Sequence, residues 1–271
     1  MITLTLKEQP SVPLEAEVLS PDIMAELSAA DIRALPVYLG KRQKRVDDFF
    51  EVDGGPGDQI TIRGDAARVK WIGRGMTRGR ITIDGNAGMH LGAYMSGGSI
   101  EVSGNGSDWV GAEMSGGLIR IGGNAGGQIG AAYRGSNSGM RDGTILVGGS
   151  AGLEVGMRMK RGIIAIGGPV RDFAGLQMKG GTIVLGRGAE LRTGAWMVRG
   201  TIISLRRVPL MPTFSYAATY MPGFLRIYST YLGSLGVTLP FDEQQGTFQR
   251  YTGDTSVPGK GEILIWTARG A

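Results

Sequence analysis

The sequence has no cysteine among its 271 residues and a single histidine, His90. The lack of cysteine excludes disulfides, cysteine-ligated iron–sulfur clusters and thiolate nucleophiles. One histidine cannot build a zinc site of the Cys/His type. Long apolar runs are missing as well, because none approaches the roughly 18 residues of a membrane-spanning helix. Since the first residues do not follow the charged-then-apolar order of a signal peptide, we expect a soluble, cytoplasmic protein.

Motifs for catalysis and nucleotide binding are also lacking. The segment most similar to a phosphate-binding loop is Gly253–Gly261. It has five residues, in place of four, between Gly253 and Gly259, and it has Gly261 where the motif requires a magnesium-binding hydroxyl. A glycosidase or lyase needs clustered carboxylates, whereas outward positions carry them singly. The net charge of +5 is too small to indicate a nucleic-acid or membrane partner. We therefore expect no catalytic site and no metal site in this chain.

Glycine, in contrast, is abundant, with 48 residues, and it recurs at a fixed interval. From about Asp58 to Leu205 the spacing is nineteen residues, with one interval of twenty-six. Self-similarity at a period of this size predicts a solenoid or array. The repeating positions are Gly79, Gly98, Gly117, Gly143, Gly162, Gly181 and Gly200.

Each repeat has the same internal order. In the repeat from Gly79 to Gly98, Ile81 and Ile83 alternate with polar residues as in a half-buried strand. A turn follows at Gly85; we then expect a second short strand at Leu91 and a further apolar residue at Met95. Equivalent residues form columns from one repeat to the next. The clearest columns are Ile60, Ile81, Ile100, Ile119, Ile145, Ile164, Ile183 and Ile202, and Met76, Met95, Met114, Met140, Met159, Met178 and Met197.

One repeat is too small to fold by itself. Four buried side chains stabilise it by about 6–12 kcal/mol, whereas ordering nineteen residues costs about 1–2 kcal/mol for each. The repeats must therefore stack as coils joined by hydrogen bonds. We therefore predict a mainly β fold, and we expect a right-handed helix because nineteen is not a multiple of the six residues of a left-handed hexapeptide helix. The expected architecture is a right-handed parallel β-helix of seven to eight coils with small α/β caps at both ends.

The domain organisation follows from where the repeats begin and end. We expect an N-terminal cap of strands and short helices at 1–56, the coils at 57–205 and a C-terminal cap at 206–271. Within the last of these, Phe224–Leu235 reads as a helix packed on the last coil and Gly259–Trp266 includes a final strand. The longest interval carries seven extra residues at Tyr133–Gly139, which must project as a loop. This loop either makes contacts or is idle surface.

Two outward columns stand out. The first comprises Trp71, His90, Trp109, Gln128, Glu154, Phe173 and Arg192, and its aromatic members indicate a contact with the chain's own caps or with another subunit. We interpret His90 itself as a surface residue. The second, beside the methionines, is a basic ridge that is either a solvated face or a track for an extended polyanion. Its members are Arg78, Lys160, Arg161, Lys179 and Arg199.

The glycine-rich coils resemble the GXGXG domain shared by the large subunit of glutamate synthase and the C subunit of formylmethanofuran dehydrogenase. Features outside the coils favour the second family, and together they cover nearly the whole chain. These are Leu19–Asp22, Leu35–Gly40, Asp48–Val52, Gly253–Asp254 and Gly259–Ile263. That family includes the formyltransferase/hydrolase complex, whose C subunit is similar.

The resemblance implies a non-catalytic subunit of a one-carbon complex. It also implies partners: a hydrolase-like A subunit and a formyltransferase D subunit, which would exchange formyl groups on a methanofuran-type coenzyme with a polyglutamate tail. The basic ridge would then be the candidate site for that tail. Two alternatives remain: the C subunit of an archaeal formylmethanofuran dehydrogenase, and a bracing domain like that of glutamate synthase. A solenoid that binds a small molecule is a third, but the sequence shows no pocket for it.

Overall fold

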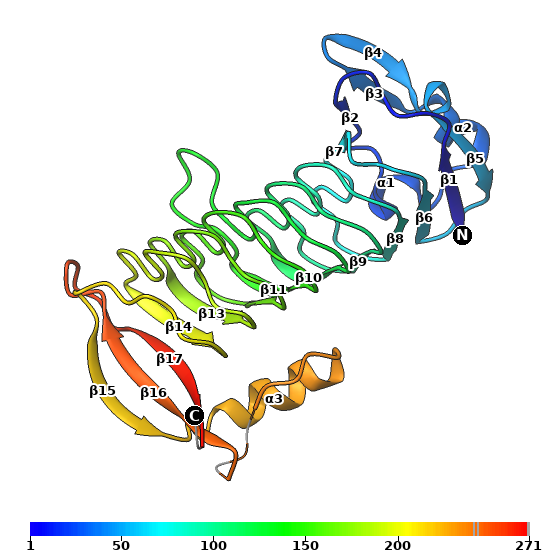
Figure 1. Cartoon of the computed structure of the whole chain (residues 1–271). Coiled ribbons are helices and arrows are strands. Elements are labelled where there is room, and N and C mark those ends of the chain that lie inside the picture. The colour runs from blue at the N-terminus through cyan, green and yellow to red at the C-terminus, as the bar shows by residue number, and fades with distance from the viewer. Residues whose placement is uncertain (241, 243, 270–271) are drawn as a thin grey trace.

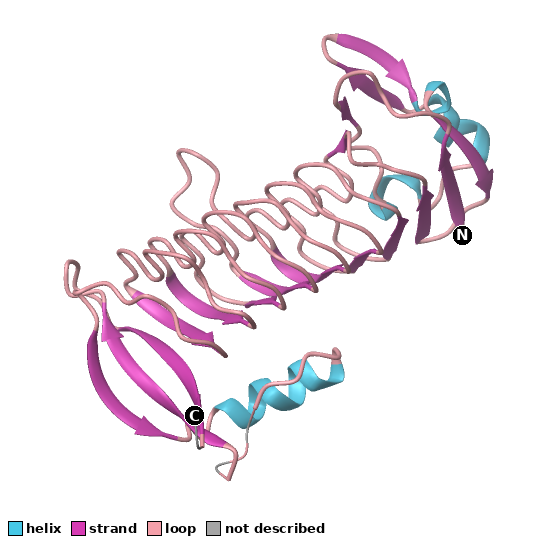
Figure 2. Ribbon diagram, in the orientation of Figure 1, coloured by secondary structure: helices cyan, strands magenta, loops and turns pink. Residues whose placement is uncertain are grey.

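The computed structural model describes residues 1–240, 242 and 244–269. The fold is mainly β, with one 13-stranded sheet and one four-stranded sheet. Successive turns of the chain lie one behind another along an elongated body, between smaller regions at the two ends (Figures 1 and 2). The alternating segments found in the sequence form β6 (Gln59–Arg63), β8 (Arg80–Asp84), β9 (Ser99–Val102), β10 (Ser115–Ile121), β11 (Asp142–Val147), β12 (Ile163–Ile166), β13 (Lys179–Leu185) and β14 (Arg199–Ser204).

These strands pair in parallel, each with its equivalent in the next coil. Ile119 of β10 lies opposite Ile100 of β9 on one side and Ile145 of β11 on the other. The predicted column of isoleucines therefore occupies one sheet, and its members are buried, as are the methionines of the second column. Glycine is required beside them at Gly92, where an added Cβ would come within 2.5 Å of the Ile119 side chain. The apolar columns thus form a continuous core.

The prediction of a second short strand in each repeat, at Leu91 and its equivalents, is wrong. Around Leu91 the chain forms a tight turn, because His90, Gly92 and Tyr94 all have positive φ, at 64°, 61° and 61°. The turn is nevertheless bound to its neighbours: the amide of His90 donates to the Asp108 carbonyl at 3.0 Å. Coil-to-coil hydrogen bonding therefore continues where strand geometry does not.

The N-terminal residues cover the first coil. Strand β1 (Ile2–Leu6) adds to the large sheet in parallel, with Ile2 opposite Ile60, and β5 (Phe50–Gly54) closes that edge in antiparallel pairing. The small sheet has the order β4-β3-β2-β7, and short helices lie beside it. These elements are β2 (Leu14–Glu15), α1 (Pro21–Met24), α2 (Ala29–Ala34), β3 (Pro36–Leu39), β4 (Arg42–Arg45), the 3-10 helix η1 (Val46–Asp48) and β7 (Val69–Lys70).

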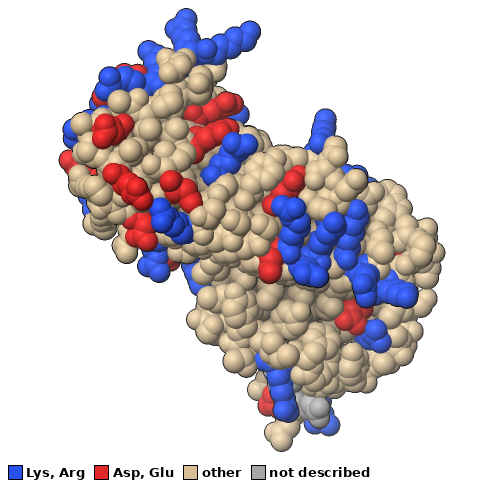
Figure 3. All heavy atoms as spheres, turned by 180° about the vertical axis from the view of Figure 1, so that it is seen from behind, with Lys and Arg blue, Asp and Glu red and all other residues tan. Residues whose placement is uncertain are grey.

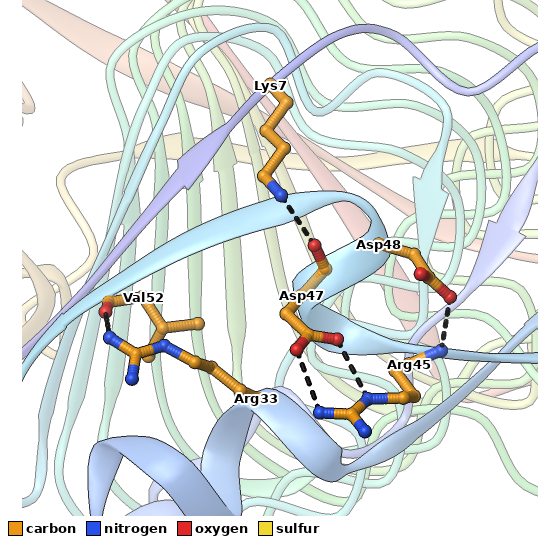
Figure 4. Close-up of polar contacts among 6 residues, drawn as sticks. All are labelled: Lys7, Arg33, Arg45, Asp47, Asp48 and Val52. Atoms are coloured by element: carbon orange, nitrogen blue, oxygen red, sulfur yellow. Dashed lines mark hydrogen bonds and ion pairs between the residues drawn. The ribbon is translucent and has the colours of Figure 1, made fainter.

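Polar contacts fix the short helices against the strands of this region (Figure 4). The Arg33 guanidinium of α2 donates to the Val52 carbonyl of β5 at 2.7 Å. Arg45 forms a bidentate pair with Asp47, at 2.9 and 2.8 Å, and the Lys7 ammonium reaches the Asp47 carbonyl at 2.6 Å. Ser28 caps α2, because its hydroxyl accepts a hydrogen bond from the amide of Asp31 at 3.2 Å.

The C-terminal residues return to the same sheet. They form β15 (Ser215–Tyr220), α3 (Leu225–Ser234), β16 (Gly246–Gly253) and β17 (Gly261–Ala268). The predicted final strand, β17, continues the parallel stack, with Ile263 opposite Ile202 of β14. The helix lies farther along the coils than expected. Tyr228 and Tyr231 of α3 reach Thr182 of β13 and Thr144 of β11, so α3 spans the outward face of several coils.

The longest helix of the described part, α3, has 10 residues. None of the described helices has the length and apolar character needed to cross a membrane.

Candidate functional site

The first outward column is a stack of aromatic rings. The rings of Trp71 and His90 lie 4.1 Å apart at 11°, and Trp109 follows at 6.3 Å from His90. All three residues have positive φ, between 64° and 67°. This backbone conformation costs a residue with a side chain about 1–2 kcal/mol, so ring stacking and coil-to-coil hydrogen bonds must offset a cost that recurs in successive coils.

The inserted loop covers this stack. It projects from the middle of the coils (Figure 1), and its first residue, Tyr133, stacks on Trp109 with ring centroids 4.8 Å apart. The Tyr133 hydroxyl lies 2.8 Å from Nδ1 of His90, and the Tyr133 amide donates to the Glu113 carboxylate at 2.9 Å. The loop therefore makes contacts with its own chain, and the aromatic column packs against this loop, a segment that sequence reasoning did not assign to it.

The interpretation of His90 as a simple surface residue is wrong. It is half-buried between the two tryptophans and under Tyr133. Burial, together with the smaller effect of the Lys70 charge, lowers the pKa of His90 to about 4, while the charge of Asp108 opposes the change. Burial likewise raises the pKa of the Tyr133 hydroxyl. Both rings are thus neutral at pH 7, and their contact serves packing and hydrogen bonding.

Two cations hold the rest of the loop. The Arg158 guanidinium donates to the Ser136 carbonyl and to the Gln177 side chain, each at 2.7 Å. The Lys179 ammonium donates to the Asn137 carbonyl, also at 2.7 Å. Lys179 belongs to the predicted basic ridge, and part of its hydrogen-bonding capacity is thus engaged by the loop.

The structure brings four of the five ridge residues together. Lys160 and Arg161 precede β12, and Lys179 and Arg199 occupy opposite positions on β13 and β14. Lys160, Arg161 and Arg199 are exposed. Arg78 does not join them: it lies four coils from Arg161, about 19 Å at the spacing of paired strands. The equivalent positions of the coils between them hold Gly97, Gly116 and Asp142.

Two cations of this face were not singled out from the sequence. Arg141 is exposed and precedes Lys160 by one coil, and a nineteen-residue count backwards would have found it. Lys260 comes after the repeats end, but its amide donates to the Val198 carbonyl at 2.7 Å, which places it next to the last coil. No periodic signal marks Lys260. Lys and Arg side chains gather over the coils on the face shown in Figure 3.

A hollow of about 480 Å³ adjoins the ridge. The inserted loop contributes Asn137, the coils contribute Lys179 and Trp196, and the C-terminal loop contributes Val257. The side chains of Lys179 and Arg158 bring positive charge to it. Such an arrangement can bind an anion by charge and hydrogen bonding, while none of the described residues forms a cluster of three or more metal-ligating side chains.

Comparison with known proteins identifies relatives in one family. No family model matches the chain. It is 44% identical over 97 residues to the C subunit of the tungsten-containing formylmethanofuran dehydrogenase 2 of Methanothermobacter thermautotrophicus, a match over 34% of this chain and 36% of the relative. It is 41% identical over 95 residues to the C subunit of the molybdenum-containing formylmethanofuran dehydrogenase 1 of Methanosarcina barkeri, covering 33% and 32%. The match thus spans about a third of the length of these curated relatives.

A solved structure matches over nearly the full length. A chain from the crystal structure of the formyltransferase/hydrolase complex (FhcABCD) of Methylorubrum extorquens, determined with methylofuran, superposes with a TM-score of 0.87. The two sequences are 31% identical, and the match covers 97% of this chain and 98% of the other. The chain belongs to the family formed by the C subunits of formylmethanofuran dehydrogenase.

Proposed function

We propose that this chain is a cytoplasmic, non-catalytic subunit of a formyltransferase/hydrolase complex and organises the catalytic subunits around it. The observation that carries the proposal is the full-length match, at 31% identity, to a chain of such a complex. The internal organisation supports it, because the coil core is filled by stacked isoleucine and methionine side chains. A rigid body of this kind supplies fixed surfaces at defined distances.

In this proposal the partners are a hydrolase-like A subunit and a formyltransferase D subunit. The C subunit of an archaeal formylmethanofuran dehydrogenase remains the second candidate, because curated relatives with that name are up to 44% identical over a third of the chain. We retain as part of the proposal a division into 1–56, 57–205 and 206–271, with the middle part a right-handed parallel β-helix. The parallel register of the strands supports that architecture.

Identification of the co-purifying subunits tests the assignment. The chain should be expressed with an affinity tag from its own chromosomal locus, and the purified complex analysed by mass spectrometry. We expect a hydrolase-like and a formyltransferase subunit in fixed stoichiometry. Recovery of a tungsten or molybdenum subunit would favour the dehydrogenase, and recovery of glutamate synthase subunits would overturn both.

We further propose that the basic ridge holds the anionic tail of a methanofuran-type coenzyme. Support comes from cations on three successive coils: Lys160 and Arg161 in the first, Lys179 in the second and Arg199 in the third, all exposed except the half-buried Lys179. Repeated cations at a spacing of about 4.8 Å suit a chain with repeated carboxylates. Exposed pairs contribute about 0.2–1 kcal/mol each, so several must act together.

Charge reversal tests this second proposal. We expect the double substitution Lys160→Glu and Arg161→Glu to lower the amount of coenzyme retained by the purified complex by at least tenfold. Arg78→Glu is the matched control, because Arg78 lies four coils away and pairs with Glu26 at 3.9 Å. Unchanged coenzyme retention in the double variant would show that the ridge does not bind the tail. Equal loss of coenzyme in both variants would indicate a nonspecific effect of charge.

A further inference from the structure

A hairpin formed by β3 and β4, here termed the basic hairpin, projects from the N-terminal end of the molecule. Leu39 and Arg42 lie opposite each other at its turn, and Gly40, the first of the two turn residues, has the positive φ of 62° that such a turn favours. The hairpin stands away from the coils (Figure 1), and Lys and Arg side chains project at this end of the molecule in Figure 3. All five residues of Lys41–Arg45 are exposed, and only Gln43 among them is uncharged.

Most of the positive charge of the basic hairpin is not neutralised within the chain. Arg45 forms its bidentate pair with Asp47 (Figure 4). Lys41, Arg42 and Lys44, in contrast, form no ion pair with any of the described residues. These three exposed cations therefore attract an anionic partner to β4.

Strand β4 is also an edge of the small sheet, whose order is β4-β3-β2-β7. The Val46 amide donates to the Leu35 carbonyl at 3.0 Å, so alternate residues of β4 turn their backbone groups toward β3, and Gln43 and Arg45 turn theirs outward. The Asp48 carboxylate accepts the outward amide of Arg45 at 3.0 Å (Figure 4). The amide and carbonyl of Gln43 and the carbonyl of Arg45 are thus left for another chain.

The charge decides which kind of chain can occupy this edge. A second copy of β4 is disfavoured, because two such strands side by side place like charges opposite each other. Arg42 and Lys44 are two residues apart, about 6.8 Å along a strand, which is also the spacing of alternate side chains in an extended partner. Acidic residues at alternate positions of a polypeptide would therefore lie beside both cations. Nucleic acid fits less well, because its phosphates offer no donor to the outward carbonyls.

We propose that the basic hairpin is the docking site for an extended acidic segment of a partner subunit. The segment adds to β4 as a further strand, bonded to the backbone of Gln43, and its acidic residues at alternate positions lie beside Arg42 and Lys44. The inference rests on the proposed organising role, because it assigns a surface to one of the subunits that the chain would hold.

Cross-linking of the purified complex with a water-soluble carbodiimide tests the proposal. The reagent joins a lysine amine directly to a carboxylate, so only groups in contact react. We expect mass spectrometry to find Lys41 or Lys44 joined to an acidic residue of another subunit. If other subunits co-purify and neither lysine is joined to them, the inference fails and the proposed function stands. If no subunit co-purifies, the proposed function fails, and the binding of an acidic peptide still tests the hairpin.

The peptide probe is a fluorescently labelled nonapeptide of alternating glutamate and threonine, titrated with the full-length chain and followed by anisotropy. We expect saturable binding that weakens as salt is added. A triple variant of the hairpin should bind the peptide at least tenfold more weakly. It carries Lys41→Gln, Arg42→Gln and Lys44→Gln, which alter only exposed side chains.

The matched control removes three exposed charges outside the hairpin, with Arg80→Gln, Arg187→Gln and Arg207→Gln. We expect it to bind the peptide as the unchanged chain does. Absence of peptide binding, equal binding by the two triple variants, or equally tight binding of a peptide with glutamine in place of glutamate would overturn the proposal. Tighter binding of oligothymidylate than of the peptide, lost in the hairpin variant, would also overturn it, because the occupant would then be a nucleic acid.

Discussion

At the scale of single residues, the side chains on the outside of the coils decide how the ends and the loop are held. Asp254 is the clearest case, because it is 2% exposed. Its carboxylate accepts the amide of Trp196 at 2.9 Å, and the amide and hydroxyl of Ser256 at 2.8 and 2.7 Å. Asp254 therefore fastens the C-terminal loop to the last coil, which gives a physical reason for the Gly253–Asp254 motif noticed in the sequence.

Substitution of Asp254 should destabilise the chain in a pH-dependent way. Burial raises the pKa of this carboxyl, but the hydrogen bonds from Ser256 and Trp196 outweigh it and leave the pKa below its ordinary value. Its stabilising effect is then present above pH 3.8 and is lost as the pH falls below that value. We expect Asp254→Asn to cost about 1–3 kcal/mol at pH 7, measured by urea unfolding.

The exposed Asp84 provides the control for this substitution. Asp84→Asn should change the free energy of unfolding by less than about 0.5 kcal/mol. Equal effects of the two substitutions at pH 7 would show that Asp254 does not anchor the loop.

His90 should also make the stability of the chain depend on pH, over a higher pH range than Asp254 does. Its pKa is about 4 in the folded chain and near 6.5 in the unfolded chain. Between these values the unfolded chain binds a proton that the folded chain does not, so stability falls as the pH is lowered. Because the ring is only half-buried, we expect a loss of about 1–2 kcal/mol between pH 7.5 and pH 4.5 after solvent screening.

A glutamine at this position separates the ring's titration from its packing. Gln128 occupies the equivalent place in the column with the same positive φ, so His90→Gln retains the backbone. Urea unfolding of His90→Gln should show a loss of stability over this pH range that is smaller than that of the unchanged chain by the same 1–2 kcal/mol. Identical pH profiles would contradict the assigned burial of His90.

At the scale of elements, the inward columns were predictable from sequence because alternation and a nineteen-residue period encode them directly. The turn at Leu91 was not, since nothing in the propensities of His90 or Tyr94 indicates a positive φ. The contact between Tyr133 and His90 and the pairing of β17 with β14 join residues far apart in the chain. Such contacts leave no periodic trace in one sequence. The same limit hid Lys260, whereas the four-coil distance of Arg78 from Arg161 follows from the repeat count itself.

The inward columns should respond to substitution as a continuous core. Ile119 is fully buried, with Ile100 and Ile145 on either side. We expect Ile119→Ala to cost about 2–5 kcal/mol and Ile119→Val about 0.5–1.5 kcal/mol, because the cavity cannot close between neighbouring coils. Denaturant unfolding measures both. A cost below about 1 kcal/mol for Ile119→Ala would show that the column is loosely packed.

At the scale of the whole molecule, the chain is an elongated body closed at both ends by its own strands. Strands β1 and β5 occupy one end of the large sheet, and β17, β16 and β15 occupy the other. The outward faces, in contrast, carry the basic ridge, the inserted loop and helix α3. This separation between a filled interior and varied outer faces suits a subunit that positions others.

The most direct measurement of the proposed organising role is a comparison of the complex with and without this chain. The remaining subunits should be purified after deletion of its gene, and assayed for hydrolysis of the formylated coenzyme and, by size-exclusion chromatography, for assembly. The account predicts that the isolated chain has no hydrolytic activity and that the other subunits no longer elute together without it. Formyl hydrolysis by the isolated chain, or an intact complex in its absence, would contradict the account.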